Sequence, residues 1–331
     1  MHESPPPVPQ DVSVRPTSRV RFFVFAVIAV LAVTLVALAA LLLVRIGGIG
    51  FYDRAMASFV LRDTVIAERS YESVAPSRFG LSGLKPIELS GVTGVSDYAR
   101  AKGTEAVIAK DAEGVPQVFL LNRENVALTG SPAAKASLAV SPDGKYIAYA
   151  SRTDGESEYT PELSAWSMQV ISIADGSVAT LGTGFAPSFF TRDDATWLLY
   201  TSADAITVTK VEEGSFVAFS TPFEINDDVW FAAKASPDGQ YLALRDAATR
   251  QFSLYGIRRA TADLPLGLDP LTTDLVGLYD VAFAGGSVYG IDAFDAGIEG
   301  GVAVLKVDPS SDVEGKSVYL FPASGNYRLI P

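Results

Sequence analysis

Two distant stretches of the chain share one pattern, a tight turn followed by alternating apolar and polar positions. A Ser-Pro-Asp-Gly turn, called the SPDG turn below, precedes KYIAYAS and recurs before QYLALRD. Pro fixes φ at the first corner, Asp accepts a hydrogen bond from nearby backbone, and Gly adopts the positive φ that ends the turn. The alternation after each turn predicts a half-buried strand. The two copies comprise Ser141, Pro142, Asp143 and Gly144, and Ser236, Pro237, Asp238 and Gly239.

Three weaker copies of the turn-and-strand pattern lie before, between and after the SPDG turns. They are residues 101–103 before TEAVIAKD, 191–194 before ATWLLYTS, and 284–286 before SVYGIDA. Each copy is followed by a second strand and a polar turn, and most by a third strand. Spacings of roughly 40 to 50 residues are typical of four-stranded propeller blades.

The runs AVSPDGKYIAYAS and KASPDGQYLALRD resemble the WD40-like, or PD40, repeat of the TolB-type β-propellers. In that repeat the SPDG turn joins the two inner strands of a blade. The resemblance is strong over these two runs and extends only as a pattern over residues 95–325. It implies an all-β propeller, with six blades in the best-known members. Because the chain shows five units, we expect five to six blades within residues 91–331, with the final YLFPASGNYRLIP a candidate for a ring-closing strand.

An uninterrupted apolar stretch precedes these repeats. Residues 22–44 contain no charge and one weakly polar side chain, Thr34. At 1.5 Å per residue, such a helix spans the ~30 Å hydrocarbon core of a bilayer. The apolar core of a cleaved signal peptide is shorter, at about 7 to 15 residues. We therefore expect an uncleaved signal anchor in the cell membrane.

The anchor suggests a domain order for the whole chain. Residues 1–20 are rich in Pro and predict a disordered cytoplasmic tail, followed by the membrane anchor at residues 21–46. Residues 47–90 predict a short juxtamembrane helix and a Pro- and Gly-containing linker. The propeller at residues 91–331 is expected on the extracytoplasmic side, since long domains translocate largely regardless of charge.

Charge and composition exclude several functions. Beyond residue 45 the chain carries 22 basic and 36 acidic residues, a formal charge of −14. A body this acidic is repelled by phosphate backbones, so no nucleic-acid partner is expected. The chain has no Cys, and its single His is His2 in the tail. A Ser-His-Asp triad, a cysteine nucleophile and a histidine-ligated zinc site are therefore excluded from the body.

Carboxylates leave one enzymatic alternative. The chain resembles propellers that accompany hydrolase domains in prolyl-oligopeptidase-like peptidases, but it lacks a G-x-S-x-G nucleophile motif. A glycoside hydrolase or lectin-like propeller would instead use acids at the mouth of the ring axis. The candidate acids are Asp193, Asp194, Asp227, Asp228, Asp292 and Asp295.

Ordinary solvated turns and loops are the favoured explanation of these acids. A cation site formed by Asp292, Asp295 and Glu299 is a second possibility, although the spacing differs from that of an EF-hand. The leading interpretation is a non-enzymatic module without cofactor or metal that binds a protein or peptide on its rim. It could also serve as an accessory subunit of an envelope complex.

Overall fold

The structure is a computed structural model. It describes residues 18–45, 58–61, 65–69, 73–79, 84–89, 91–121, 125–156, 160, 162–202, 206–211, 215–219, 233–245, 251–258, 267–275, 278–284, 286–292, 301–307, 316–322 and 326–330. The chain divides into two compact units, residues 1–52 and 53–331.

The first unit contains helix α1 (Ser18–Arg45), of 28 residues. It is built mainly from Leu, Ala, Val and Phe. The hydroxyl of Thr34 donates a hydrogen bond to the carbonyl of Val30 at 2.8 Å. The described side chains, Phe23 and residues 25–38, are exposed. In the described ranges, none of the helices meets the combined requirements of length and hydropathy for a bilayer crossing.

In the second unit, the described strands form six antiparallel four-stranded sheets. From the inner to the outer strand, three of these sheets are β24 (Asn326–Ile330), β1 (Val65–Arg69), β2 (Val74–Arg78) and β3 (Lys85–Pro86); β4 (Thr93–Ala101), β5 (Thr104–Lys110), β6 (Pro116–Leu120) and β7 (Val126–Ala127); and β8 (Lys135–Val140), β9 (Tyr146–Arg152), β10 (Trp166–Ser172) and β11 (Val178–Thr183). In the same order, the other three are β12 (Phe185–Arg192), β13 (Ala195–Thr201), β14 (Ile206–Lys210) and β15 (Ser215–Phe219); β16 (Ala233–Ala235), β17 (Tyr241–Arg245), β18 (Phe252–Arg258) and β19 (Gly267–Leu275); and β20 (Leu278–Ala284), β21 (Ser287–Asp292), β22 (Gly301–Val307) and β23 (Lys316–Pro322).

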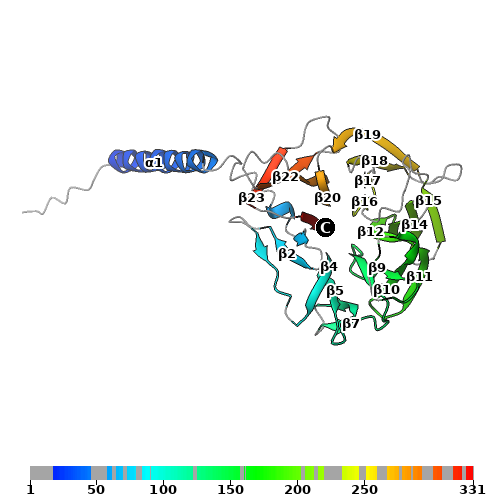
Figure 1. The fold of residues 1–331 in the computed structure, drawn as a ribbon. Coiled ribbons are helices and arrows are strands. Elements are labelled where there is room, and N and C mark those ends of the chain that lie inside the picture. Colours follow the sequence, from blue (N-terminus) through cyan, green and yellow to red (C-terminus); the bar gives the residue numbers. More distant parts are fainter. Residues whose placement is uncertain are drawn as a thin grey trace, which may run out of the picture. The chain divides into compact units, whose positions relative to one another are not determined.

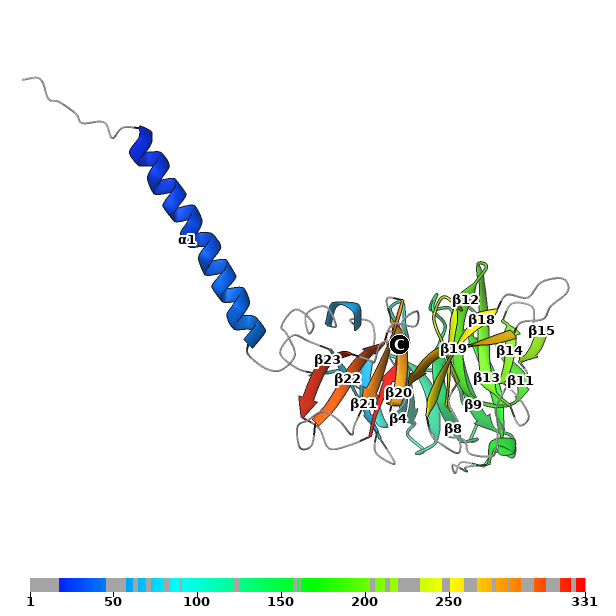
Figure 2. The same ribbon diagram turned by 90° about the horizontal axis from the view of Figure 1, so that it is seen from above.

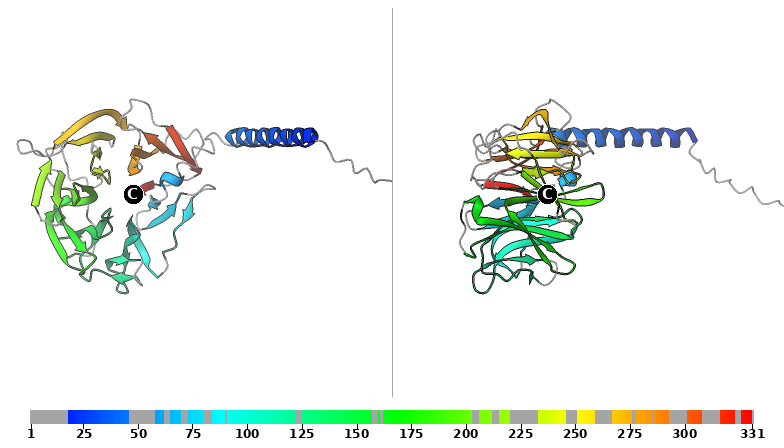
Figure 3. Two further views of the ribbon diagram at one scale, coloured as in Figure 1. Left: turned by 180° about the vertical axis from the view of Figure 1, so that it is seen from behind. Right: turned by 90° about the vertical axis from the view of Figure 1, so that its right-hand side faces the viewer.

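The sheets are arranged radially around one axis. Strands β4, β12, β16 and β20 lie near the centre, and β7, β11, β15, β19 and β23 lie outside (Figure 1). The view from behind shows the same ring (Figure 3), and the turned view shows strands running from one face of the ring to the other (Figure 2). The predicted all-β propeller is therefore confirmed. The five repeat units correspond to five of the six sheets formed by the described residues.

The sixth sheet joins the two ends of the second unit. Strand β24 pairs with β1 from Val65 opposite Ile330 to Arg69 opposite Asn326. The inner strand therefore comes from the last residues, and the outer three come from residues 65–86. Part of the segment predicted as a juxtamembrane helix and linker, residues 47–90, is thus sheet: β1 contains Val65 and Ile66, which the helical pattern included, and β2 and β3 lie in the predicted linker. The local sequence pattern did not reveal this sheet because Pro76, which disfavours strands, lies within β2, and because the inner partner of β1 is distant in the sequence.

Apolar side chains between neighbouring sheets form the core. Between β8–β11 and β12–β15, Trp166 is completely buried and meets Phe185 edge-on, with ring centroids 5.4 Å apart. Equivalent clusters pack the other neighbouring sheets together, for example around Ile108 and Leu138. Burial of such side chains contributes roughly 1.5 to 3 kcal/mol each, so the ring is stabilised largely between blades.

Candidate functional site

The two SPDG turns lie between the first and second strands of their sheets and share one hydrogen-bond pattern. In the first, the Ser141 hydroxyl donates to Asp143 Oδ1 at 2.7 Å and accepts from the amides of Lys145 and Tyr146 at 3.1 and 2.9 Å. In the second, the Ser236 hydroxyl donates to Asp238 Oδ1 at 2.5 Å and accepts from the amides of Gln240 and Tyr241, again at 3.1 and 2.9 Å. The buried serine therefore organises each turn, a role that the sequence pattern did not reveal.

Hydrogen bonding within the first turn also changes the acidity of its aspartate. Partial burial alone would raise the pKa of the Asp143 carboxyl. Hydrogen bonds from the Ser141 hydroxyl and the Lys145 amide, with the Lys145 ammonium 3.3 Å away, outweigh that effect and lower the pKa below its usual 3.8. The carboxylate is therefore held in its charged form as part of the turn.

The glycine of each SPDG turn contacts the preceding sheet. Gly144 and Gly239 have φ of +74° and +66°, which favours glycine. Their carbonyls accept hydrogen bonds from the preceding sheet, one from the Thr104 hydroxyl at 3.1 Å and one from Arg192 Nη1 at 3.2 Å. The turns therefore join neighbouring blades, as well as strands within a blade.

The hairpin between β12 and β13 has a different construction. Arg192 pairs with Ala195, so Asp193 and Asp194 form a two-residue loop. Their φ values are +50° and +60°. Two successive positive φ values are typical of a type I′ turn, in which Asp is tolerated better than most residues other than glycine. The backbone thus holds two adjacent exposed carboxylates at one face of the ring.

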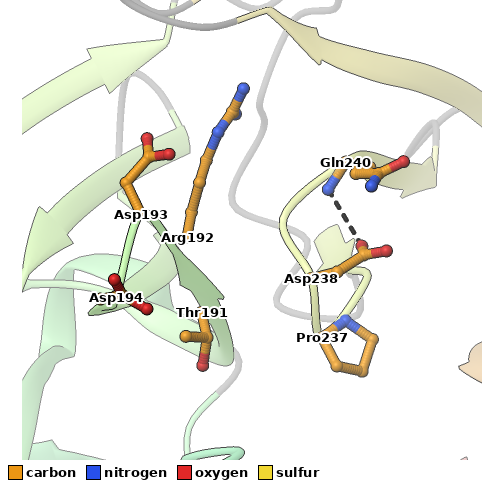
Figure 4. A pocket seen from close by; sticks show the side chains of 7 residues that line it. All are labelled: Thr191, Arg192, Asp193, Asp194, Pro237, Asp238 and Gln240. Atoms are coloured by element: carbon orange, nitrogen blue, oxygen red, sulfur yellow. Dashed lines mark hydrogen bonds between the residues drawn. The ribbon is translucent and has the colours of Figure 1, made fainter.

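A pocket of about 640 Å³ lies between this hairpin and the second SPDG turn. Figure 4 shows the two turns and the side chains that line the pocket. The backbone amide of Thr191 donates to the carbonyl of Pro237 at 2.8 Å and ties the turns together. Arg192 adds a bond from Nη2 to the Ile257 carbonyl at 3.3 Å. The lining residues are Thr191, Arg192, Asp193, Asp194, Pro237, Asp238 and Gln240.

The chemistry available in this pocket is polar. Asp193, Asp194, Asp238 and Gln240 are exposed, whereas Arg192 is only partly exposed and donates to two backbone carbonyls. The pocket therefore presents mainly hydrogen-bond acceptors and negative charge on a backbone fixed from two blades. Such a surface can recognise a donor or a cation on a partner.

The other candidate acids do not join this pocket within the described residues. Asp292 ends β21, at the opposite end of that strand from the β20–β21 turn. Since the β12–β13 turn occupies the same end of its sheet as the β20–β21 turn, Asp292 and the Asp193–Asp194 pair lie at opposite faces of the ring. Asp227, Asp228, Asp295 and Glu299 lie outside the described residues. Among the described residues, no group of His, Cys, Asp and Glu is arranged to hold a metal ion.

Comparison with known proteins identifies a fold. No family model and no curated protein sequence matches the chain. The structure of TolB from Acinetobacter baumannii is similar, with a TM-score of 0.52 at 12% identity, covering 81% of this chain and 66% of that one. The fold is that of a TolB-like propeller. At this identity the likeness concerns the fold alone.

Two peptidase structures are matched less closely. A Mycobacterium tuberculosis puromycin-hydrolyzing peptidase gives a TM-score of 0.49 at 17% identity, over 76% of this chain and 42% of that one. A prolyl endopeptidase gives 0.45 at 14% identity, over 82% and 38%. The chain thus spans less than half the length of either peptidase.

Proposed function

We propose that this chain is a non-enzymatic propeller that binds a protein or peptide partner on the face formed by its inner turns. The observation that supports this proposal is the pocket between the Asp193–Asp194 hairpin and the second SPDG turn. Its walls come from two blades and are held together by the Thr191 amide and the Arg192 guanidinium. A preorganised surface loses little conformational entropy on binding, which favours recognition.

We propose this pocket as the position where the partner binds. Gln240 and Asp194 are exposed and line it from opposite sides. A photoreactive amino acid at either position in the full-length protein is expected to crosslink to one partner in native membranes. The control position is Val178, which is half exposed on the outer strand β11. Equal crosslinking from Val178 would contradict binding at the pocket.

A charge variant tests the contribution of the hairpin. Asn tolerates positive φ as Asp does, so D193N/D194N preserves the turn while removing two charges. The crosslinked adduct at Gln240 is expected to fall several-fold with no change in melting temperature. An unchanged adduct in the correctly folded variant would show that the hairpin does not contact the partner.

We also propose that the chain is anchored in the cell membrane through residues 22–44, with the tail at residues 1–20 in the cytoplasm and the propeller outside it. The whole apolar stretch supports this proposal, because residues 22–44 contain no charged side chain. Helix α1 has 28 residues, and a helix of that length extends about 42 Å. Exposed Phe25, Val33 and Leu35 are 72%, 70% and 68% accessible, a surface that favours a lipid environment.

Fractionation tests the anchor. The full-length protein is expected to remain in the membrane pellet after alkaline carbonate extraction, whereas a chain beginning at Asp53 is expected in the supernatant. Release of the full-length protein by carbonate would overturn the proposal. Protease added outside the cell should degrade the propeller, and protection of the propeller would contradict the proposed orientation.

A further inference from the structure

A buried ion pair lies where the ring closes. Lys234 on β16 and Asp280 on β20 approach to 2.5 Å between Nζ and Oδ1. Their side chains are 15% and 11% exposed, so water screens the pair only weakly. The two residues belong to neighbouring sheets, and both sheets are formed from continuous stretches of the chain.

The same pair also binds the inner strand of the closing sheet. Asp280 Oδ2 accepts from the amide of Leu329 at 2.8 Å. Lys234 Nζ donates to the carbonyl of Leu329 at 3.1 Å and to that of Val281 at 2.9 Å. Both backbone polar groups of Leu329 are therefore bound by charged side chains of two other blades, and such bonds are stronger than neutral ones.

An equivalent carboxylate elsewhere in the ring shows what is particular to this site. Asp97 on β4 pairs with Ile108, as Asp280 on β20 pairs with Ile291, and each follows an irregular step in its strand. Asp97 accepts from the amide of Leu138 on β8 at 2.8 Å. The two carboxylates thus perform the same structural task. Asp97 joins sheets that are consecutive along the chain, whereas Asp280 holds the strand that closes the ring.

We propose that Lys234 and Asp280 form an ionic latch on β24 that sets how readily the ring opens. In the part of the chain that the structure describes, strand β24 is held in the ring by pairing with β1, by apolar contacts such as those of the fully buried Leu329, and by this ion pair. Removal of one charge leaves the other buried without its counterion, which is strongly unfavourable. Opening of β24 separates the closing sheet while the five continuous sheets keep their own hydrogen bonds.

Hydrogen exchange on the full-length protein in detergent tests the latch. The variants K234M and D280N are compared with wild type and with D97N, the matched control at the equivalent carboxylate. K234M and D280N are expected to accelerate exchange at residues 326–330 and 65–69 by about tenfold or more, with exchange of β9 unchanged. D97N is expected to accelerate exchange in β8 and leave β24 at the wild-type rate.

Two outcomes would overturn the proposal. If K234M and D280N accelerate exchange equally in all sheets, the pair contributes to global stability and does not control local opening. If D97N accelerates exchange of β24 as much as D280N, the effect is not specific to the closing strand. Should K234M fail to fold, K234Q retains a hydrogen-bond donor without the charge, and it is expected to show the same local effect at residues 326–330.

Discussion

The guanidinium of Arg192 donates a hydrogen bond to the backbone carbonyl of Gly239 over 3.2 Å, from one propeller blade to the next. Gly239 is also the residue whose φ of +66° ends the second SPDG turn. Thr104 and Gly144 repeat this relationship at another blade boundary. The recurrence of the motif therefore reflects two requirements, a tight turn within a blade and a docking point for its neighbour.

Substitution of Gly239 by Ala is expected to destabilise the propeller in two ways, through the positive φ of the turn and through a clash with the neighbouring blade. Ala at positive φ costs about 1 kcal/mol, and overpacking adds roughly 1 to 3 kcal/mol. A Cβ at this position would lie 2.6 Å from Cδ2 of Phe190, whose side chain is buried and has little room to move. Urea denaturation of the propeller should show the combined loss in the free energy of unfolding.

Gly176 provides the matched control for this substitution. Its φ is +71°, but a Cβ added at this residue would meet nothing within 4 Å. The Gly176→Ala variant is therefore expected to show only the backbone cost of about 1 kcal/mol. Equal losses for the two variants would mean that the contact between Gly239 and the preceding blade contributes nothing.

The Thr104 hydroxyl should contribute to docking of the first SPDG turn. Thr104→Val keeps the shape of the side chain but removes the donor to the Gly144 carbonyl, at an expected cost of about 1 kcal/mol. Thr153→Val is the control, because the exposed Thr153 hydroxyl donates within its own blade, to the carbonyl of Ala165 in the connection between β9 and β10. Thermal unfolding that ranks the two variants in the opposite order would contradict the docking role.

Much of the fold could be predicted from local pattern. The SPDG turns and their weaker copies mark the first hairpin of five sheets, because a turn and an alternating strand are adjacent in the sequence. The closing sheet could not be found in this way. Strand β1 gains its inner partner from residues 326–330, and Pro76 made its neighbour resemble a linker.

The candidate site was predictable only in its parts. The sequence marked residues 191–194 and the second SPDG turn as turns, but their meeting across a blade boundary depends on the ring. The hydrogen bond from Arg192 to Gly239 joins residues 47 positions apart, and no local signal indicates it. The inter-blade role of Asp280 was missed for the same reason, since its partners lie on β16 and β24.

Acid should weaken the first SPDG turn through Asp143. Its folded-state pKa is lowered, so the charged carboxylate stabilises the fold above the usual value of 3.8. That stabilisation is lost as the pH falls below 3.8 toward the lower folded-state pKa. Asp143→Asn is therefore expected to reduce the dependence of unfolding free energy on pH in this acidic range. An acid profile identical to that of wild type would contradict the prediction.

Lys135 gives a second pH dependence of stability, in the alkaline range. It is 4% exposed, and its ammonium donates to the carbonyls of Ser131 and Ala133 at 2.8 Å each. Burial lowers the pKa of Lys135 from 10.5 to about 8, and the charge of Asp111 opposes this only partly. Burying the charged amine therefore destabilises the fold below about pH 8, where both folded and unfolded chains carry the proton.

Between pH 8 and 10.5 the unfolded chain binds more protons at this lysine than the folded chain does. The free energy of unfolding of wild type should therefore rise with pH relative to that of Lys135→Met, by an amount on the order of 3 kcal/mol across the range. Lys145→Met, at a side chain 72% exposed, is the control and should follow wild type. Urea denaturation at several pH values measures the difference in unfolding free energy between wild type and Lys135→Met. A difference that stays flat or falls with pH would contradict the prediction. It would show that folded Lys135 keeps its proton over this range, because loss of the proton only in the folded state requires the difference to rise.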